Sequence, residues 1–370
     1  MSTATSEDLP FDLSLSEEQR ITRESMRRFA EQQLREVARD ADEAGAAPEG
    51  FYARTMELGL GLMPIPEAFG GAGMPRSPMS NVLNAEDLAW GDLSLALGTL
   101  TPLAFINAVL DFGSQAQQEQ FLTPLASEEF VPATVALQEG KATFEPSELA
   151  TSAVKEGDSY VISGEKRLVI HGQSARLMLV VAELQGEGPA AFVVEQGSEG
   201  LSAEAQDYMG LRAVETATVT LDNVKVPAAN RLEQFDLQRF VDLARIGTCA
   251  LAVGCCQAVL DFVTPYVKER KAFGEPIAHR QSVAFMVANI AIELDAMRLM
   301  TWRAASRAEQ GLDFHREAYL ARVLCAEKAM EIGTNGVQLL GGAGFIREYP
   351  VEMWYRNLRA IGLLEGNALV

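Results

Sequence analysis

The sequence has few of the residues that build metal sites and basic surfaces. Its 370 residues include 3 histidines and 4 cysteines, and the cysteines, none in a CxxC spacing, are Cys249, Cys255, Cys256 and Cys325. We therefore expect no Cys/His metal site, and we expect buried free thiols in a reducing compartment. The formal net charge of −20 at pH 7 argues against a nucleic-acid partner, because binding a phosphate backbone needs a basic face.

Long apolar runs are also missing. No stretch approaches the roughly 18 consecutive apolar residues that a membrane span needs, and the first residues, MSTATSEDLPFDLSLSEEQ, are acidic and polar without a signal-peptide core. With 48% hydrophobic and 22% charged residues, the composition predicts a soluble globular protein, cytoplasmic and without a membrane span. The length exceeds that of one usual hydrophobic core and predicts two or three domains.

The residue patterns change twice along the chain. Apolar residues at helical spacing run through residues 1–128, short β-branched runs bounded by Gly, Asp or Asn fill residues 129–235, and long helical patterns return in residues 236–370. We predict an α+β multidomain fold with a helical N-terminal domain, a small middle β-domain of barrel or sandwich type, and a C-terminal four-helix bundle.

Local signals place several helices in the first domain. Ser16 and Gln19 form a capping-box pattern ahead of the first helix. Apolar periodicity predicts two further helices, over Phe51–Leu58 and Asn81–Thr99. In the last domain the wide apolar faces of the helices indicate that the bundle also buries surface against other subunits.

Three motifs in the last domain are candidates for chemistry. ERKAFG holds Arg270, whose guanidinium matches phosphate oxygens, although a cation that favours a helix C-terminus is the simpler explanation. QLLGGAGF holds Gly341 and Gly342, which allow a ligand to come close to the backbone, although a helix C-cap more often accounts for such glycines. GLLEGN holds Glu365, a lone carboxylate in an apolar stretch.

These motifs, in this order and this layout, resemble the acyl-CoA dehydrogenase family over nearly the whole chain. The first domain is similar in LSEEQ, LGLGLMPIPEAFGGAGM and FGSQAQQEQFLTPLAS, and the middle domain in GDSYVISGEKRLVIHGQSA and TVTLDNVKVP. The most specific similarities are ARIGTCALAVGCCQAVLDFVTPYVKERKAFGEPI and QLLGGAGFIREYPVEMWYRNLR. The resemblance implies an FAD oxidoreductase of acyl-CoA catabolism.

The resemblance also implies a role for Glu365. In the family, a glutamate takes the α-proton of an acyl-CoA thioester while the β-hydride passes to N5 of FAD, and Glu365, followed by Gly366, matches that glutamate in most members. Other members keep the base beside the arginine that Arg245 matches. That neighbour is Ala244 here, so Glu365 is the only candidate base, and we assign Arg245 and Gly366 to the substrate region. The apolar Leu363–Leu364 is expected to keep water from the carboxylate.

FAD in the family contacts two sets of residues. The ADP half is held by positions that family tetramers supply from the neighbouring subunit, here Arg270, Phe273, Gln338, Gly341 and Gly342. The flavin half falls on positions that here are Leu137, Gln138, Thr143, Phe144, Leu168, Ile170 and Asn367. This second set departs from the family patterns Thr-Glu-Pro, any residue, Ala-Gly-Ser-Asp and Trp-Ile-Thr: Phe144 stands at the serine, Leu168 at the tryptophan and Ile170 at the threonine.

Two functions remain open at this point. The chain is an active FAD-dependent acyl-CoA dehydrogenase with a divergent flavin pocket, or it is a flavin-poor, non-catalytic subunit that offers Arg270 and Gln338 to a paralogue. The presence of Glu365 favours the enzyme. The resemblance further implies an acyl-CoA substrate, an electron-transfer flavoprotein as acceptor, and a homo-oligomer (dimer or tetramer) or a hetero-oligomer with a paralogue.

Overall fold

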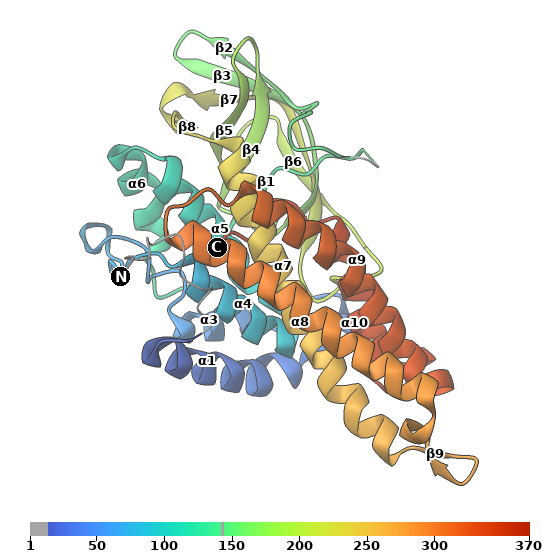
Figure 1. Cartoon of the computed structure of the whole chain (residues 1–370). Helices are drawn as coiled ribbons and strands as arrows, with labels where there is room; N and C mark the ends of the chain where they lie inside the picture. The colour runs from blue at the N-terminus through green and yellow to red at the C-terminus, as the bar shows by residue number, and fades with distance from the viewer. Residues whose placement is uncertain (1–13, 142–143) are drawn as a thin grey trace, which may run out of the picture.

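Figure 1 shows a β-sheet at one end of the molecule and a long helical bundle that extends away from it. The computed structural model describes residues 14–141 and 144–370. The first part is helical, and its α-helices are α1 (Glu17–Phe29), α2 (Ala38–Ala44), α3 (Phe51–Thr55), α4 (Pro78–Gly91), α5 (Leu93–Phe112) and α6 (Gln115–Leu122). Shorter turns of π- or 3₁₀-helix cover Ala30–Arg35, Met56–Leu58, Glu67–Phe69 and Thr123–Leu125.

The ends of these helices follow from their capping residues. Ser16 and Gln19 form the predicted capping box, each side chain accepting a hydrogen bond from the backbone of the other. The helix expected over Asn81–Thr99 is instead two helices. Asp92 lies between them in an extended conformation, and its carboxylate accepts the N–H of Leu95 at 2.9 Å as the N-cap of α5.

The middle part is one eight-stranded sheet. Its strands are β1 (Ala133–Ala136), β2 (Ser152–Glu156), β3 (Ser159–Ile170), β4 (Leu177–Leu184), β5 (Gly188–Glu195), β6 (Leu201–Ala205), β7 (Thr216–Pro227) and β8 (Arg231–Leu232). The order is β6-β7-β3-β2-β4-β5-β8, and β1 pairs with β4 in parallel. Alternate residues of β4 enter different cores: Leu179 packs with the helices, and Val180 packs inside the sheet. Strand β1 therefore lies where the sheet meets the helices.

The last part is the predicted helical bundle. It contains α7 (Leu237–Glu269), α8 (Gln281–Glu309), α9 (His315–Leu340) and α10 (Val351–Leu358). Short 3₁₀ turns cover Ile277–His279, Gly341–Phe345 and Arg359–Gly362, and a small hairpin of β9 (Lys271–Ala272) and β10 (Glu275–Pro276) joins α7 to α8. Helix α7 packs against α4, α8 and α9. The predicted fold class, helical domain, β-domain and helical bundle, is thus confirmed.

Two helices, α5 and α7, are long and apolar enough to cross a membrane by length and composition alone. However, 89% of the apolar window in α5 and 78% of that in α7 is buried inside the chain. Such burial is typical of core helices.

Candidate active site

The Glu365 carboxylate lies between two arginines from different helices. Its Oε1 is 3.3 Å from Nη2 and 3.4 Å from Nε of Arg322 in α9, and its Oε2 is 3.7 Å from Nε of Arg245 in α7. The side chains are 11% exposed for Glu365, 14% for Arg245 and 10% for Arg322. We call these three residues the Glu365 cluster. One carboxylate among two guanidiniums leaves the cluster with an excess of positive charge.

Arg322 was not among the residues predicted from the sequence. It lies on the face of α9 that also carries the buried residues Ala318, Ala321, Cys325 and Ala329. A charged residue on such a face is rarely buried without a partner. That pattern was the available signal, but nothing in the sequence identified the partner, which lies 43 residues further along.

The expected apolar surroundings of Glu365 are not found. Leu364 is buried, but Leu363 is 51% exposed and turns away from the cluster. The carboxylate instead faces guanidinium groups from α7 and α9. Oε2 of Glu365 and Nε of Arg245 form an ion pair with each other at 3.7 Å, and within the described residues neither buried atom has a hydrogen-bond partner.

The segment that follows, Gly366–Val370, fills the space between α5 and α7. Gly366 has φ of +79°, and a Cβ there would lie 3.2 Å from Cβ of Leu137. The carbonyl of Asn367 accepts a bond from the Thr101 hydroxyl at 3.3 Å, and that of Leu369 accepts one from the Asn107 amide at 3.1 Å. A ligand must displace part of this segment to reach Glu365 from that side.

Several residues predicted to hold the flavin gather next to Glu365. Leu137 contacts the Gly366 position, and the carbonyl of Gln138 accepts the N–H of Arg167 at 2.9 Å, which places Leu168 beside it. Leu168 has φ of +53°, at a register shift between β3 and β7. Leu137, Leu168, Ile170 and Asn367 are all buried. Phe144 is half-buried against the helical core, and Thr143 lies outside the described residues.

A buried ion pair, Lys166 with Glu139, lies next to Leu137. Nζ of Lys166 is 2.8 Å from Oε1 of Glu139 and donates to the carbonyl of Leu137 at 3.1 Å. Glu139 also accepts the N–H groups of Ala150 and Thr151. Burial lowers the pKa of Lys166 to about 8, although Glu139 acts to raise it. Burial would raise the pKa of Glu139, but Lys166 and the two N–H groups outweigh it and lower that pKa.

The residues predicted for the ADP half, Arg270, Phe273, Gln338, Gly341 and Gly342, are here called the distal set. All five are exposed. Arg270 ends α7, and Phe273 and Gly274 form the tip of the β9–β10 hairpin with φ of 54° and 87°. Phe273 is 93% exposed. Gly341 is the C-cap of α9, as the simpler explanation held, and a Cβ on Gly341 or Gly342 would meet nothing within 4 Å.

The distal set is not brought to Glu365 within one chain. Arg245 and Arg270 are both on α7, 25 residues apart, which corresponds to roughly 37 Å along the helix. Arg322 and Gln338 are both on α9, roughly 24 Å apart by the same rise per residue. In Figure 1 the β9 hairpin lies at the far end of the bundle, well away from the label that marks the C-terminus.

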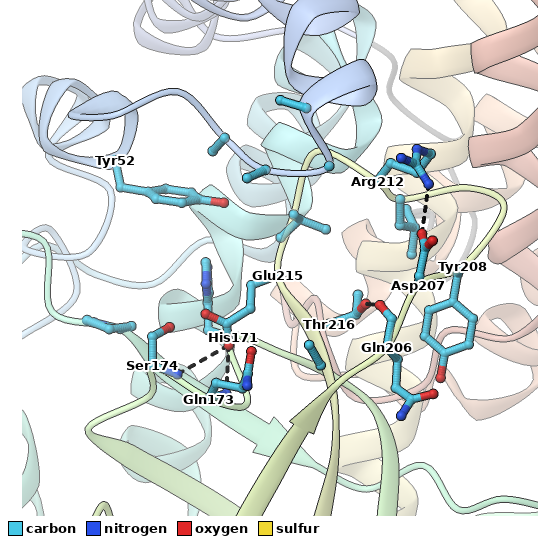
Figure 2. Close-up of a pocket in the computed structure, with 18 of the residues that line it drawn as sticks. Tyr52, His171, Gln173, Ser174, Gln206, Asp207, Tyr208, Arg212, Glu215 and Thr216 are labelled. Atoms are coloured by element: carbon cyan, nitrogen blue, oxygen red, sulfur yellow. Dashed lines mark hydrogen bonds and ion pairs between the residues drawn. The ribbon is translucent and has the colours of Figure 1, made fainter.

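A cavity of about 820 Å³ lies between the first helices and the sheet, and Glu365 does not line it. Figure 2 shows Tyr52 above the cavity, with His171 and Glu215 below and Asp207 paired with Arg212 at its side. Glu215 accepts the N–H groups of Gln173 and Ser174. The carboxylates of Glu215 and Asp207 are therefore paired within the protein, while the Tyr52 hydroxyl is buried without a hydrogen-bond partner among the described residues. The Glu365 cluster differs in bringing a carboxylate and two guanidiniums together where each is mostly shielded from water. The cluster is the better candidate for chemistry.

The four cysteines are buried and free, as predicted. Burial raises the pKa of the Cys255 thiol. A hydrogen bond with Cys249, and after it burial, raises the pKa of the Cys325 thiol. In the part of the chain that the structure describes, no group of three or more His, Cys, Asp or Glu residues is arranged to hold a metal ion. The chemistry of the cluster rests on a carboxylate and two guanidiniums.

The fold and the Glu365 cluster define a three-domain protein with a carboxylate poised at the junction of the sheet and the bundle. Family models match all three parts: the N-terminal domain of acyl-CoA dehydrogenases over residues 16–129, the middle domain over 134–224 and the C-terminal domain over 236–370. The chain belongs to the acyl-CoA dehydrogenase family, a family of flavin-dependent oxidoreductases.

Individual relatives agree over most of their length. The chain is 33% identical to a probable acyl-CoA dehydrogenase of Bacillus subtilis (strain 168), covering 96% of each protein. It is 30% identical to the mitochondrial short-chain specific acyl-CoA dehydrogenase of Mus musculus, covering 96% of this chain and 88% of that protein. The structure of butyryl-CoA dehydrogenase from Megasphaera elsdenii superimposes with a TM-score of 0.87 at 28% identity, covering 97% of this chain and 96% of that one.

Proposed function

We propose that the chain dehydrogenates an acyl-CoA thioester at its α and β carbons, with Glu365 as the base and FAD as the cofactor. The observation that carries the proposal is the Glu365 cluster: a nearly buried carboxylate whose Oε2 has no hydrogen-bond partner among the described residues. The nearest charged group to this oxygen is Arg245 at 3.7 Å, beyond hydrogen-bond distance, so its lone pairs can accept a proton. The carboxylate takes the α-proton, the β-hydrogen leaves with both electrons of its bond, and the α and β carbons form a double bond.

The excess positive charge of the cluster suits this reaction. Negative charge develops on the thioester as the α-proton leaves, and fixed cations in a site with little water stabilise it strongly. The Nε atom of Arg245 is buried and unpartnered, so it has an N–H to offer to a developing oxyanion. In this proposal Arg245 therefore acts on the substrate, and Gly366 lets the chain turn beneath it with φ of +79°.

FAD, when bound, supplies the two-electron acceptor for the β-hydrogen. The residues that would hold its flavin are Leu137, Gln138, Leu168, Ile170 and Asn367. Two of them offer buried hydrogen-bond acceptors to such a polar, planar group. Oε1 of Gln138 and Oδ1 of Asn367 are buried without partners among the described residues, and a buried acceptor requires a donor. The N–H groups of a flavin ring are such donors.

The ADP half of FAD would be held by the distal set of a second chain. This part of the proposal is supported by the separation of roughly 37 Å along α7 between Arg270 and Arg245. It is also supported by apolar side chains exposed on the bundle: Phe285, Ile292 and Leu299 at seven-residue intervals on α8, and Tyr319, Leu320 and Val323 on α9. Apolar stripes of this kind mark protein interfaces, so we include a homo-oligomer, a dimer or tetramer.

The alternative function, a flavin-poor subunit paired with a paralogue, is favoured by one observation. Leu168 and Ile170 are buried, and Gly366–Val370 closes the space between α5 and α7. A chain with this arrangement has an open distal set and a closed site of its own. For either function we further propose an electron-transfer flavoprotein as acceptor and, because the four cysteines are free, a reducing, cytoplasmic location.

The visible spectrum of the purified protein tests the proposal. We expect a yellow protein with flavin absorbance that bleaches when an acyl-CoA is added. Glu365→Gln should retain the flavin and lose the bleaching, whereas Glu348→Gln, an exposed control, should bleach normally. A colourless protein that takes up no added FAD would exclude the self-sufficient enzyme and support the alternative.

A further inference from the structure

The Glu365 cluster contains an arginine whose hydrogen bonds all go to one turn of the chain. Nη1 of Arg322 donates to the carbonyl of Ile361, and Nη2 donates to the carbonyl of Leu364 at 3.4 Å. Nη2 and Nε both donate to Oε1 of Glu365, at 3.3 and 3.4 Å. Arg322 thus binds the backbone and the carboxylate of the same turn from α9, a separate helix.

Arg322 is not the only group that holds this turn. The N–H groups of Leu363 and Leu364 donate to the carbonyl of Ala360 at 2.8 and 3.0 Å, and the side-chain amide of Asn367 donates to the carbonyl of Glu365 at 3.2 Å. The turn comprises Ile361–Glu365, with Gly362 inside it and Gly366 directly after it, and both glycines give the backbone unusual freedom. It also follows a 3₁₀ turn, Arg359–Gly362, whose last carbonyls have no partner within the turn itself. Arg322 adds donors for two carbonyls of this turn and for the carboxylate itself, so a side chain 43 residues earlier in the sequence contributes to the position of Glu365.

We propose that Arg322 is a positioning residue for Glu365: its guanidinium clamps the Ile361–Glu365 turn and holds the carboxylate in the place from which it acts. The proposal rests on the proposed function only for the reaction that Glu365 performs. The clamp itself is a property of the resting protein and is measurable without substrate or flavin.

The two arginines of the cluster have different roles. Arg322 makes four hydrogen bonds to the turn, whereas Arg245 approaches Glu365 only at 3.7 Å and keeps its Nε without a partner among the described residues. The first arginine is committed to the protein, and the second is free for a ligand. Loss of Arg322 should therefore misplace the base, and loss of Arg245 should weaken contact with the substrate.

A simple helix-capping role is the competing explanation, and two substitutions separate it from the clamp. Arg322→Gln keeps an N–H donor for the carbonyls and removes the charge, whereas Arg322→Lys keeps the charge and loses the planar fork. Capping alone predicts that glutamine replaces arginine at least as well as lysine does. The clamp predicts that lysine is the better replacement, because it can still pair with Glu365. Arg316→Gln, an exposed arginine of the same helix, is the matched control.

The first experiment is a double-mutant cycle of Arg322→Gln and Glu365→Gln, read by urea unfolding of the full chain. Each single variant should raise the unfolding equilibrium constant about tenfold or more, and the double variant should raise it much less than the product of the two. Additive effects would overturn the clamp. This result does not depend on activity, so it decides the proposal even if the protein proves to be the flavin-poor subunit.

The second experiment follows exchange of the α-hydrogen of a saturated acyl-CoA with D₂O by mass spectrometry, with the flavin content of each variant recorded. Arg322→Gln should lower the maximal exchange rate about 10- to 100-fold with little change in the acyl-CoA concentration at half-maximum, and Arg322→Lys should restore part of it. Equal rates in wild type and Arg322→Gln would overturn the positioning role. Absence of exchange in the wild type would instead contradict the proposed function.

Discussion

Arg245 and Arg270 are on the same helix, α7, in opposite surroundings. Near Arg245, three charged side chains from three elements converge, and each is mostly shielded from water. Near Arg270, the guanidinium has no partner among the described residues, and the neighbouring Phe273 is almost fully exposed. The first end is assembled inside one chain, whereas the second presents recognition groups outward. A single chain therefore contains a buried charged cluster near one end of α7 and an exposed set of polar, glycine and aromatic residues near the other.

The largest effect on stability should come from removing the carboxylate of Glu365. Glu365→Leu leaves two poorly solvated guanidiniums without a carboxylate, and we expect the free energy of unfolding to fall by about 3 kcal/mol. Urea unfolding measures it, with Glu348→Leu as the exposed control. If Glu365→Leu is as stable as wild type, the carboxylate is not paired in the resting protein and the comparison between the two ends of α7 fails.

Near the middle of α7, a buried carboxyl group should make the stability of the protein depend on pH. Glu86 of α4 packs there, bonded to Trp302 and close to Arg298, and burial raises its pKa from 4.5 to about 7 despite these partners. A raised pKa means that the folded protein binds a proton on Glu86 more tightly than the unfolded chain does. The stability gained from this protonation is complete below about pH 4.5 and is lost as pH rises through 7, by about 3 kcal/mol at most.

Unfolding by urea at pH 5 and at pH 7.5 measures this contribution. We expect Glu86→Gln to show a smaller loss of stability between these pH values than wild type, and Glu31→Gln, an exposed control, to match wild type. An unchanged difference in Glu86→Gln would show that Glu86 titrates normally.

A smaller effect of opposite sign is expected at the β9–β10 hairpin. Phe273 and Gly274 both have positive φ, the pattern of a type I′ turn that favours asparagine and glycine. Phe273→Asn should raise the free energy of unfolding by about 1 kcal/mol while weakening FAD retention on gel filtration. Gly274→Ala should destabilise by a similar amount. A loss of stability in Phe273→Asn would mean that the phenylalanine packs within its own chain.

The smallest effect on stability should come from Arg270. Arg270→Gln removes no contact within the described residues, so we expect a change below about 0.5 kcal/mol. FAD retention, measured by absorbance after gel filtration, should nevertheless fall. If Arg270→Gln destabilises the isolated chain and keeps its flavin, Arg270 serves its own subunit and the distal set is not a surface for another chain.

Features set by neighbouring residues could be predicted from the sequence. The capping box at Ser16, the long helices α7, α8 and α9, and the change to short strands in the middle part depend on spacings of a few residues. The break at Asp92 was missed because apolar periodicity continues across it. The Asp92 side chain caps a new helix at a point where the apolar spacing predicted one continuous helix.

Motifs in the sequence identified Glu365 and the distal set, but they did not predict which residues surround Glu365. Arg245, Arg322 and Glu365 belong to three separate elements, and which charges meet is decided by how α7 and α9 pack around the turn after Gly362. The exposure of Leu363 and the closing of the α5–α7 space by Gly366–Val370 have the same origin.

The sequence by itself determined the three-part architecture and pointed to the candidate base and the distal set, because periodicity, capping and motif order are local properties of the chain. Only the tertiary structure decided that Arg322 hydrogen-bonds to Glu365 and that Arg245 approaches the same carboxylate from another helix. Burial brings together charges that are far apart in sequence, and a buried charge must find a partner wherever the fold provides one.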